Sequence, residues 1–216
     1  MNIFRFSNLI ANLPVRQQCF TTRKSTWQNF ENQTSWLRAI NEHLFEENNS
    51  LVMSRNDVFN TENVREKIIK TIYWGYPRGM RGNNFTNIIN QIDIIQTTII
   101  GVLENRNRTT QDFFQLANSF GRIQGIGLST YSKLLYFFDI RFNNLPSLIL
   151  DQRLIDVFKR NIFENFQHLN NINYTNAENF YMDYLKTINV TSENLGCREE
   201  NIEQFLFMFG NNIKEI

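Results

Sequence analysis

Helix-breaking residues are scarce in this sequence, and their scarcity constrains the fold more than any other feature. The 216 residues include nine glycines and three prolines, and most segments between them carry apolar residues at positions i, i+3, i+4 and i+7. This spacing puts apolar side chains on one face of an α-helix. Residues 1–24, interrupted by Pro14, show no clear pattern. We therefore expect an all-α protein.

The expected helices are joined by short connections. They cover about residues 25–47, 61–75, 85–104, 109–120, 128–138, 152–160, 176–189 and 198–212. The segment 85–104 carries a strongly apolar stripe and predicts a buried central helix. Residues 73–85 contain three glycines and a proline and predict a loop, and Pro146 predicts a second break. Asp151 stands where the N-cap of the next helix is expected.

Composition excludes several classes of function. The net charge is +1, so a nucleic-acid role has to rest on local patches and helix dipoles. Two distant cysteines without a signal-peptide pattern indicate a reduced, cytoplasmic protein. Apolar runs fall far short of the roughly 20 residues that span a bilayer, so no membrane partner is expected. His43 and His168 are isolated in helical segments, and we expect no metal site.

The stretch GRIQGIGLSTYSKLLYFF, residues 121–138, is the most informative motif. A dinucleotide-binding fingerprint is excluded because a helix precedes the motif and the third glycine is absent. Two interpretations stay open on spacing alone. One is a plain connection between two core helices. The other is a helix-hairpin-helix, in which the free N–H groups after Gly125 and Gly127 bind one DNA phosphate without reading the sequence.

The run I-x-G-I-G-L-S-T-Y-S-K-L-L, followed by L-I-L-D-Q-R-L-I, resembles the helix-hairpin-helix DNA glycosylases. It looks most like the compact bacterial and archaeal proteins with the 8-oxoguanine DNA glycosylase fold, and the similarity centres on residues 110–160. The resemblance implies two helical lobes, one of residues 65–160 and one of residues 1–64 plus 161–216. It further implies a monomer that binds double-stranded DNA in the groove between them. No cofactor is implied, with a structural monovalent cation at the hairpin as the alternative.

The same resemblance implies roles for two charged residues. Asp151 stabilises positive charge that develops on the sugar and assists proton transfer, and Lys133 attacks the first carbon of the sugar to form an imine. The alternatives are that Asp151 is only a helix cap and that Lys133 is a surface or phosphate-contacting lysine. The family lysine usually follows the second glycine by two residues, where this chain has Ser129. Lys133 lies one helical turn later and could still reach the same cleft. Gly125, Gly127 and Ser129 are the expected phosphate contacts.

Glycosylases have to flip a base out of the duplex and fill the gap that it leaves. The loop GYPRGMRGNN occupies the place of the insertion loop in related enzymes. We expect Arg78 and Arg81 to contact flanking phosphates or the orphaned base, and Met80, Asn83 or Asn84 to enter the base stack. The alternative is an ordinary exposed connection with two solvated arginines.

The last helix, REENIEQFLFMFGNNIK, is rich in aromatic residues. By resemblance it supplies a ring that stacks on the flipped base and a glutamine that bonds the base edge. Phe207 and Gln204 are the best candidates, with Phe209 and Met208 as alternatives for the ring. An aromatic stripe at helical spacing is also typical of a plain core.

These inferences converge on a DNA N-glycosylase that excises an oxidised or otherwise modified base, 8-oxoguanine-like, by base flipping. Lys133 would add AP-lyase activity. Three alternatives stay open. The same chemistry could act on modified bases of phage DNA in defence, the protein could bind DNA without catalysis, or it could be purely structural. The identity of the base is not encoded in any pattern that we recognise.

Overall fold

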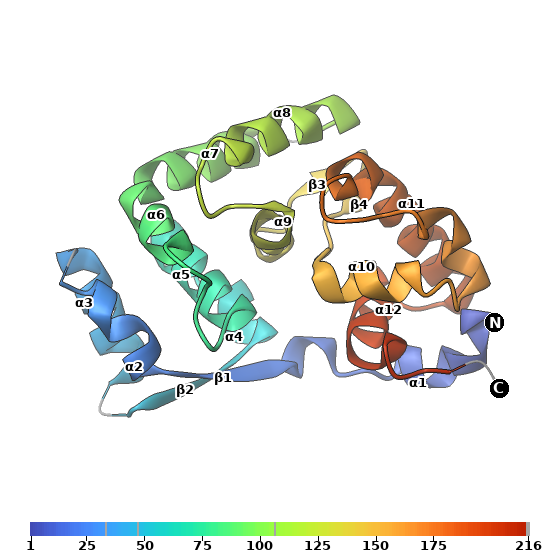
Figure 1. Ribbon diagram of the computed structural model, residues 1–216, viewed down its shortest axis with the longest axis horizontal. Coiled ribbons are helices and arrows are strands. Elements are labelled where there is room, and N and C mark those ends of the chain that lie inside the picture. The colour runs from blue at the N-terminus through green and yellow to red at the C-terminus, as the bar shows by residue number, and fades with distance from the viewer. Residues whose placement is uncertain (33, 47, 106, 215–216) are drawn as a thin grey trace. The chain divides into compact units, whose positions relative to one another are not determined.

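A computed structural model describes residues 1–32, 34–46, 48–105 and 107–214 and shows a mostly helical protein (Figure 1). The contacts within the chain divide it into two compact units. Unit 1 comprises Met1–Val15, Asn105–Asn118 and Gly127–Ile216. Unit 2 comprises Arg16–Glu104 and Ser119–Ile126. The residues expected to catalyse therefore belong to unit 1, and the expected insertion loop belongs to unit 2.

Unit 1 is built of helices and one very short hairpin. Its elements in chain order are the 3-10 turn η1 (Ile3–Phe6), α1 (Ser7–Ala11), most of α8 (Thr110–Gly121), α9 (Leu128–Phe137), β3 (Arg141–Phe142), β4 (Leu145–Pro146), α10 (Gln152–Lys159), η4 (Glu164–Leu169), α11 (Ala177–Leu195), α12 (Glu199–Phe205) and the π-helical turn η5 (Leu206–Gly210). Asn143 and Asn144 both have positive φ angles, which suit a tight hairpin turn between β3 and β4.

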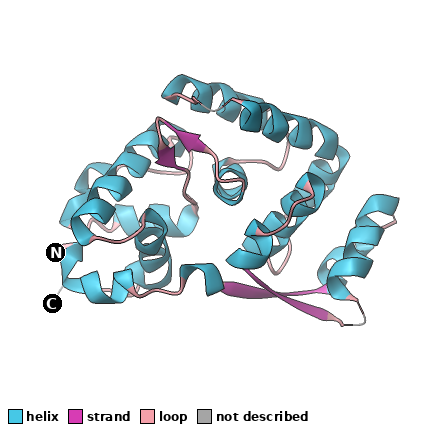
Figure 2. Cartoon of the chain, turned by 180° about the vertical axis from the view of Figure 1, so that it is seen from behind, coloured by secondary structure: helices cyan, strands magenta, loops and turns pink. Residues whose placement is uncertain are grey.

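Unit 2 combines helices with one antiparallel ribbon, drawn in magenta in Figure 2. Its elements are β1 (Cys19–Arg23), α2 (Lys24–Trp27), η3 (Gln28–Phe30), α3 (Ser35–Phe45), β2 (Ser50–Ser54), α4 (Arg55–Phe59), α5 (Val64–Gly75), α6 (Asn84–Asn90) and α7 (Ile92–Glu104), preceded at its border by η2 (Val15–Gln17). Thr21 of β1 lies opposite Val52 of β2. The N-terminus of α4 carries a capping box between Ser54 and Asp57.

An aromatic cluster forms the core of unit 2. The rings of Trp27 and Tyr73 stack with centroids 4.2 Å apart, and Phe85 meets Trp27 edge-on at 4.7 Å. The Tyr73 hydroxyl donates a hydrogen bond of 2.7 Å to Asn41, and burial raises the pKa of Tyr73. Because Tyr73 is in α5 and Phe85 is in α6, this cluster anchors both ends of the loop between these helices.

A second aromatic cluster forms the core of unit 1. Phe113 of α8 stacks on Tyr181 of α11 with ring centroids 4.8 Å apart. Tyr131 of α9 donates a hydrogen bond of 2.7 Å from its hydroxyl to Glu178 of α11. Burial, followed by that hydrogen bond and the glutamate charge, raises the pKa of Tyr131. These contacts fasten α8 and α9 to the long helix α11.

Three expectations about single elements are corrected. The expected helix 85–104 is two helices, α6 and α7, separated at Gln91, which has φ −117° and ψ 17°. No glycine or proline marks this break. The expected helix 25–47 is divided among α2, η3 and α3, and Thr34 is extended just before α3. The helix α7 buries only one face and leaves Ile94 exposed, so it is not a fully buried central helix.

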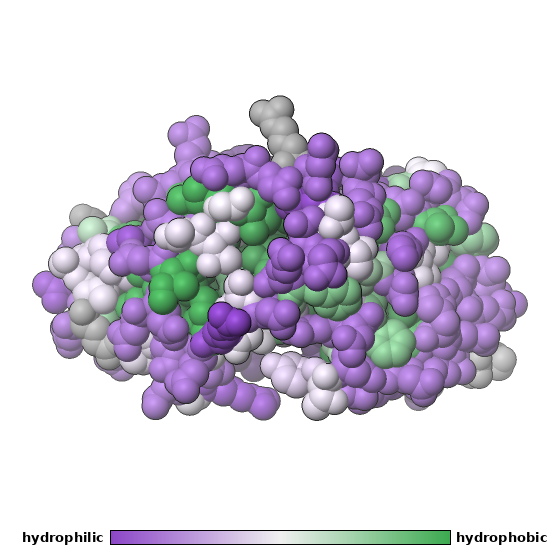
Figure 3. Space-filling model, turned by 90° about the horizontal axis from the view of Figure 1, so that it is seen from above, coloured by the Kyte–Doolittle hydropathy of each residue, from purple (hydrophilic) through white to green (hydrophobic). Residues whose placement is uncertain are grey.

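Hydrophilic side chains predominate on the face drawn in Figure 3, where hydrophobic side chains form separate patches. Among the described residues, no helix has both the length and the apolar character needed to cross a membrane.

Candidate active site

Lys133 and Asp151 lie close together in unit 1, although they are far apart in the chain. The ammonium nitrogen of Lys133 is 3.9 Å from Oδ2 of Asp151. The Lys133 side chain is almost buried, with 5% of it exposed, and the Asp151 side chain keeps 16% exposed. An ion pair in such a position is screened less than a surface pair. The structure thus brings together the two residues that the sequence singled out for chemistry.

The two oxygens of the Asp151 carboxylate have different neighbours. Oδ1 accepts hydrogen bonds from the backbone N–H groups of Arg153, at 3.0 Å, and Leu154, at 3.3 Å. Asp151 is therefore the N-cap of α10, in an extended conformation. Oδ2 is the oxygen near Lys133. One carboxylate serves both as a helix cap and as the acidic half of the candidate pair.

The segment that leads into Asp151 is held by hydrogen bonds from two helices. Tyr181 and Tyr184 of α11 donate their hydroxyls to the carbonyls of Leu148, at 2.8 Å, and Ile149, at 2.9 Å. The N–H of the next residue, Leu150, donates to the hydroxyl of Ser132 at 3.2 Å. These three buried backbone groups are therefore satisfied without belonging to a helix or a sheet.

Ser132 explains why the lysine and the carboxylate meet. Ser132 immediately precedes Lys133, and its partner Leu150 immediately precedes Asp151. Its hydroxyl also donates toward the Leu150 carbonyl at 3.4 Å. The side chain of Ser132 is fully buried. This short link between α9 and the segment before α10 thus stands one residue before each member of the candidate pair.

Ser129 contacts the lysine. Nζ of Lys133 donates to the Ser129 carbonyl oxygen at 2.7 Å and to the Ser129 hydroxyl at 3.1 Å. Both residues lie on α9, one turn apart. Ser129, the position at which the resemblance would place a lysine, thus hydrogen-bonds Lys133.

The glycine turn before α9 needs both of its glycines, for different reasons. Gly125 has φ +93°, and a Cβ there would lie 2.6 Å from the carbonyl oxygen of Asn84. Gly127 is the N-cap of α9 and has an ordinary extended backbone, but a Cβ there would lie 2.5 Å from the hydroxyl oxygen of Tyr174. No side chain caps α9 at this described end, and Tyr174 is 60% exposed.

The loop between α5 and α6 is anchored at its base and exposed at its tip. The Thr22 hydroxyl donates to the Pro77 carbonyl at 2.9 Å, and Gly79 and Gly82 both have positive φ angles. Arg78, Arg81 and Asn83 are exposed, whereas Met80 and Asn84 are partly buried. Among the described residues, neither guanidinium of this loop makes a hydrogen bond or an ion pair.

Gln204 and Phe207 lie close to each other in the chain but differ in environment. Gln204 in α12 is 2% exposed, and its carbonyl oxygen has no hydrogen-bond partner among the described residues. Phe207 is in the π-helical turn η5 and is partly exposed, with the guanidinium carbon of Arg153 4.8 Å from its ring centroid. Because Arg153 is in the first turn of α10, Phe207 lies near the helix that Asp151 caps. Rare π-helical turns often occur at functional sites.

Metal ligands do not gather in the part of the chain that the structure describes. No group of three or more His, Cys, Asp or Glu side chains there could coordinate a metal ion. The Lys133–Asp151 pair itself offers an amine and a carboxylate.

Comparison with known proteins decides the family. One family model, described as "Putative 8-oxoguanine DNA glycosylase OGG-like protein", matches residues 13–207. The chain belongs to this family. The match covers most of the chain, including every residue discussed for the candidate site, and it confirms the resemblance seen in the glycine motif. The name of this glycosylase family implies a DNA substrate. No curated protein and no solved structure matches the chain significantly.

Sequence reasoning missed the residues that position the candidate pair. Ser132, Tyr181 and Tyr184 act through backbone atoms of a segment with no regular pattern, so no periodicity pointed to them. Arg153 carried a usable signal, since it stands two residues after the predicted cap. Tyr174 carried no sequence signal, because its contact with Gly127 depends on the tertiary packing of a segment that lies 47 residues later in the chain.

Proposed function

We propose that this protein is a DNA N-glycosylase that removes an oxidised or otherwise modified base and can cleave the resulting site through Lys133. The observation that carries the proposal is the Lys133–Asp151 pair, 3.9 Å apart and largely withdrawn from solvent. Membership of a glycosylase family supplies the substrate class. The short distance between the amine and the carboxylate supports proton transfer between them.

Lys133 would act as the nucleophile once it has lost a proton. The carboxylate of Asp151 is close enough to accept that proton or to stabilise positive charge on the sugar ring. Attack of the amine on C1′ forms a C–N bond while the bond to the base breaks, and the base leaves with those electrons and takes up a proton. Opening of the sugar ring then gives the imine, from which the strand can be cleaved by elimination.

The flipped base would be received by residues of the C-terminal helix. The buried carbonyl oxygen of Gln204 lacks a partner among the described residues, and an N–H group on a base edge would satisfy it. Phe207 offers a ring for stacking beside the helix capped by Asp151. These two contacts would choose the base, whereas the lysine and the carboxylate perform the chemistry.

The glycine turn would bind the DNA backbone, and the loop between α5 and α6 would fill the gap in the duplex. Gly125, Gly127 and Ser129 lie at the uncapped N-terminus of α9, where backbone N–H groups suit a phosphate. The exposed Arg78 and Arg81 would contact phosphates or the orphaned base. Met80, Asn83 and Asn84 are the candidates for insertion into the base stack.

A second candidate function, DNA binding without catalysis, is favoured by one observation. Lys133 donates to the carbonyl and hydroxyl of Ser129, so its ammonium group has structural partners. A buried lysine with such partners needs no reaction to explain its position. The two functions differ in whether any base is released.

The deciding experiment uses a panel of duplexes that each contain one modified base. The panel includes 8-oxoguanine and pyrimidines with bulky substituents of the kind found in phage DNA. Abasic sites are revealed by alkaline cleavage after incubation with excess protein. We expect abasic-site formation on at least one duplex. Retention of the duplexes without release of any base would support the binding module and overturn the glycosylase.

A further inference from the structure

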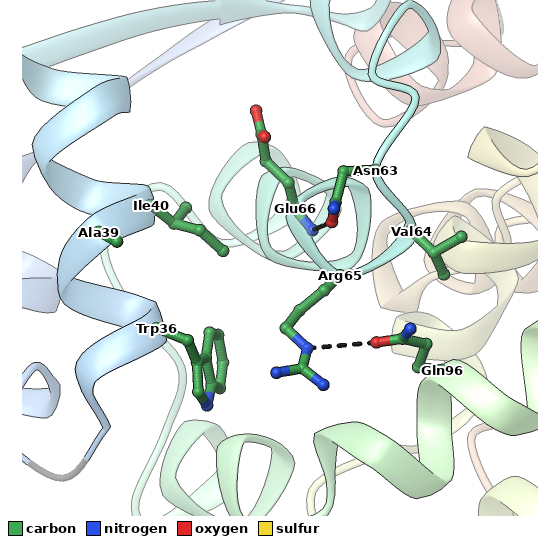
Figure 4. Close-up of a pocket in the computed structure, with 8 residues that line it drawn as sticks. All are labelled: Trp36, Ala39, Ile40, Asn63, Val64, Arg65, Glu66 and Gln96. Carbon is green, nitrogen blue, oxygen red and sulfur yellow. Dashed lines mark hydrogen bonds between the residues drawn. The ribbon is translucent and has the colours of Figure 1, made fainter.

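A cavity of about 550 Å³ lies within unit 2, well apart in the chain from the candidate catalytic residues (Figure 4). Its walls come from three helices. Trp36, Ala39 and Ile40 belong to α3, Arg65 and Glu66 to the first turn of α5, and Gln96 to α7. The volume is within the range of sites that take small organic groups, about 300–1,000 Å³.

Trp36 differs from the other two tryptophans of the chain. Trp27 and Trp74 are buried, and their indole N–H groups donate to Thr22 and to the Gln18 carbonyl. Trp36 is only partly buried, and its ring forms a wall of the cavity. The other tryptophans stabilise the core, whereas the Trp36 ring lines the cavity together with the Arg65 guanidinium.

Arg65 forms the wall next to Trp36 and is held in one orientation. Its guanidinium carbon lies 5.2 Å from the Trp36 ring centroid, and its Nε donates to Oε1 of Gln96 at 3.2 Å. A further guanidinium nitrogen pairs with Asp93. Figure 4 shows the guanidinium between the indole and the carboxamide. A planar cation fixed beside an indole is a surface on which nucleobases stack, and little side-chain entropy remains to be lost.

The charges around the cavity argue against a simple anion site. The charge of Arg65 is shared with Asp93, and Glu66 at the rim pairs with Lys70 at 2.8 Å. Because Asp93 already pairs with Arg65, a bare phosphate would gain little from the guanidinium. A neutral planar ring with donors and acceptors on its edge would instead find the Arg65 guanidinium and the Gln96 amide, which are groups that proteins use to read bases.

We propose that this cavity binds one unstacked nucleobase of a DNA strand. The cavity is built from unit 2 residues alone and contains neither Lys133 nor Asp151, so binding there is a separate property from base release. The inference uses the DNA substrate that the family implies and does not require excision. A free nucleoside shares this chemistry, and the experiment separates the two sources.

The test measures binding of a labelled oligothymidylate of about ten nucleotides, within the site sizes of single-strand binding proteins. Trp36→Ala removes the stacking wall, and Ala39→Trp fills the cavity while keeping Trp36. Thr97→Ala, an exposed position on α7, is the control. Loss of a stacking partner should weaken affinity about 5- to 100-fold in both cavity variants, at every salt concentration. The control should bind like the wild type.

Thermal unfolding shows which variants are folded. If Trp36→Ala does not fold, the affinity of Ala39→Trp decides the test. Unchanged oligonucleotide affinity in a folded cavity variant would overturn the proposal. Thymidine alone should quench Trp36 fluorescence only at concentrations far above those needed for the oligonucleotide. Tighter binding of thymidine than of the oligonucleotide would overturn the assignment to a DNA strand. Trp36-dependent binding by a protein that releases no base would uphold the cavity and reject only the proposed glycosylase activity.

Discussion

Two irregular connections of this protein are built in opposite ways. The segment from Ser147 to Leu150 is buried, and its backbone is bonded to Tyr181, Tyr184 and Ser132. The loop between α5 and α6 is bonded at its base and exposes Arg78 and Arg81 at its tip. The difference matches what each connection would have to do. A carboxylate used in a reaction needs a fixed position, whereas a loop that enters DNA needs freedom to adapt.

The largest expected effect concerns the nucleophile beside the fixed segment. Lys133→Gln should lower the yield of borohydride-trapped complex with abasic DNA about a hundredfold or more, because a carboxamide cannot form an imine. Lys159→Gln, at an exposed position in α10, is the matched control and should trap like the wild type. Undiminished trapping in Lys133→Gln would show that the nucleophile is a residue other than Lys133.

Gly125 packs against Asn84, at the end of the loop between α5 and α6. A substitution at Gly125 therefore tests whether this end of the loop is as rigid as the segment before Asp151. Gly125→Ala puts a side chain at φ +93° and 2.6 Å from the Asn84 carbonyl oxygen. Strain of this kind costs about 1–3 kcal/mol, and the collision adds to it. Chemical denaturation should therefore show a clear loss in the free energy of unfolding. Wild-type stability of Gly125→Ala would mean that the backbone around Gly125 and Asn84 can shift to accept a side chain with no loss of unfolding free energy.

Ser132→Ala tests the fixed segment directly. The substitution leaves the N–H of Leu150 buried without its partner, which costs about 1–3 kcal/mol of unfolding free energy. If Ser132 also positions the pair, single-turnover excision should fall about tenfold while DNA affinity stays the same. A loss of stability with an unchanged excision rate would make Ser132 purely structural.

The smallest effect is expected at the loop tip. Arg81→Ala should weaken DNA binding a few-fold and reduce the slope of log affinity against log salt by about one, because one phosphate contact is lost. Unfolding free energy should not change, since the side chain is exposed and makes no hydrogen bond or ion pair with the described residues. Arg38→Ala on the exposed side of α3 is the control. An unchanged salt slope would remove Arg81 from the DNA-binding surface.

The sequence predicted what depends on local patterns. The cap at Asp151, the turn at Gly125 and Gly127, and most helices follow from residue types at fixed spacings. The family match confirms the resemblance that the motif indicated. The loop after α5 was also predicted, because glycine and proline mark it.

Features that depend on distant contacts could not be predicted. The ribbon of β1 and β2 pairs Cys19 with Ser54 across an intervening run of helices, so neither strand had a visible partner. The break at Gln91 is made by one residue without a helix-breaking side chain. The hydroxyls of Tyr181 and Tyr184 bond carbonyls more than 30 residues earlier, and a lone tyrosine in a helix carries no sign of such a role.

Asp151→Asn separates the capping role of the Asp151 carboxylate from its proposed catalytic role. Asparagine caps helices about as well as aspartate, so the free energy of unfolding should stay within about 1 kcal/mol of the wild type. Single-turnover base release should fall about a hundredfold or more, because the charge beside Lys133 is gone, while Asp156→Asn keeps full activity. Base release by Asp151→Asn at the wild-type rate would contradict the account.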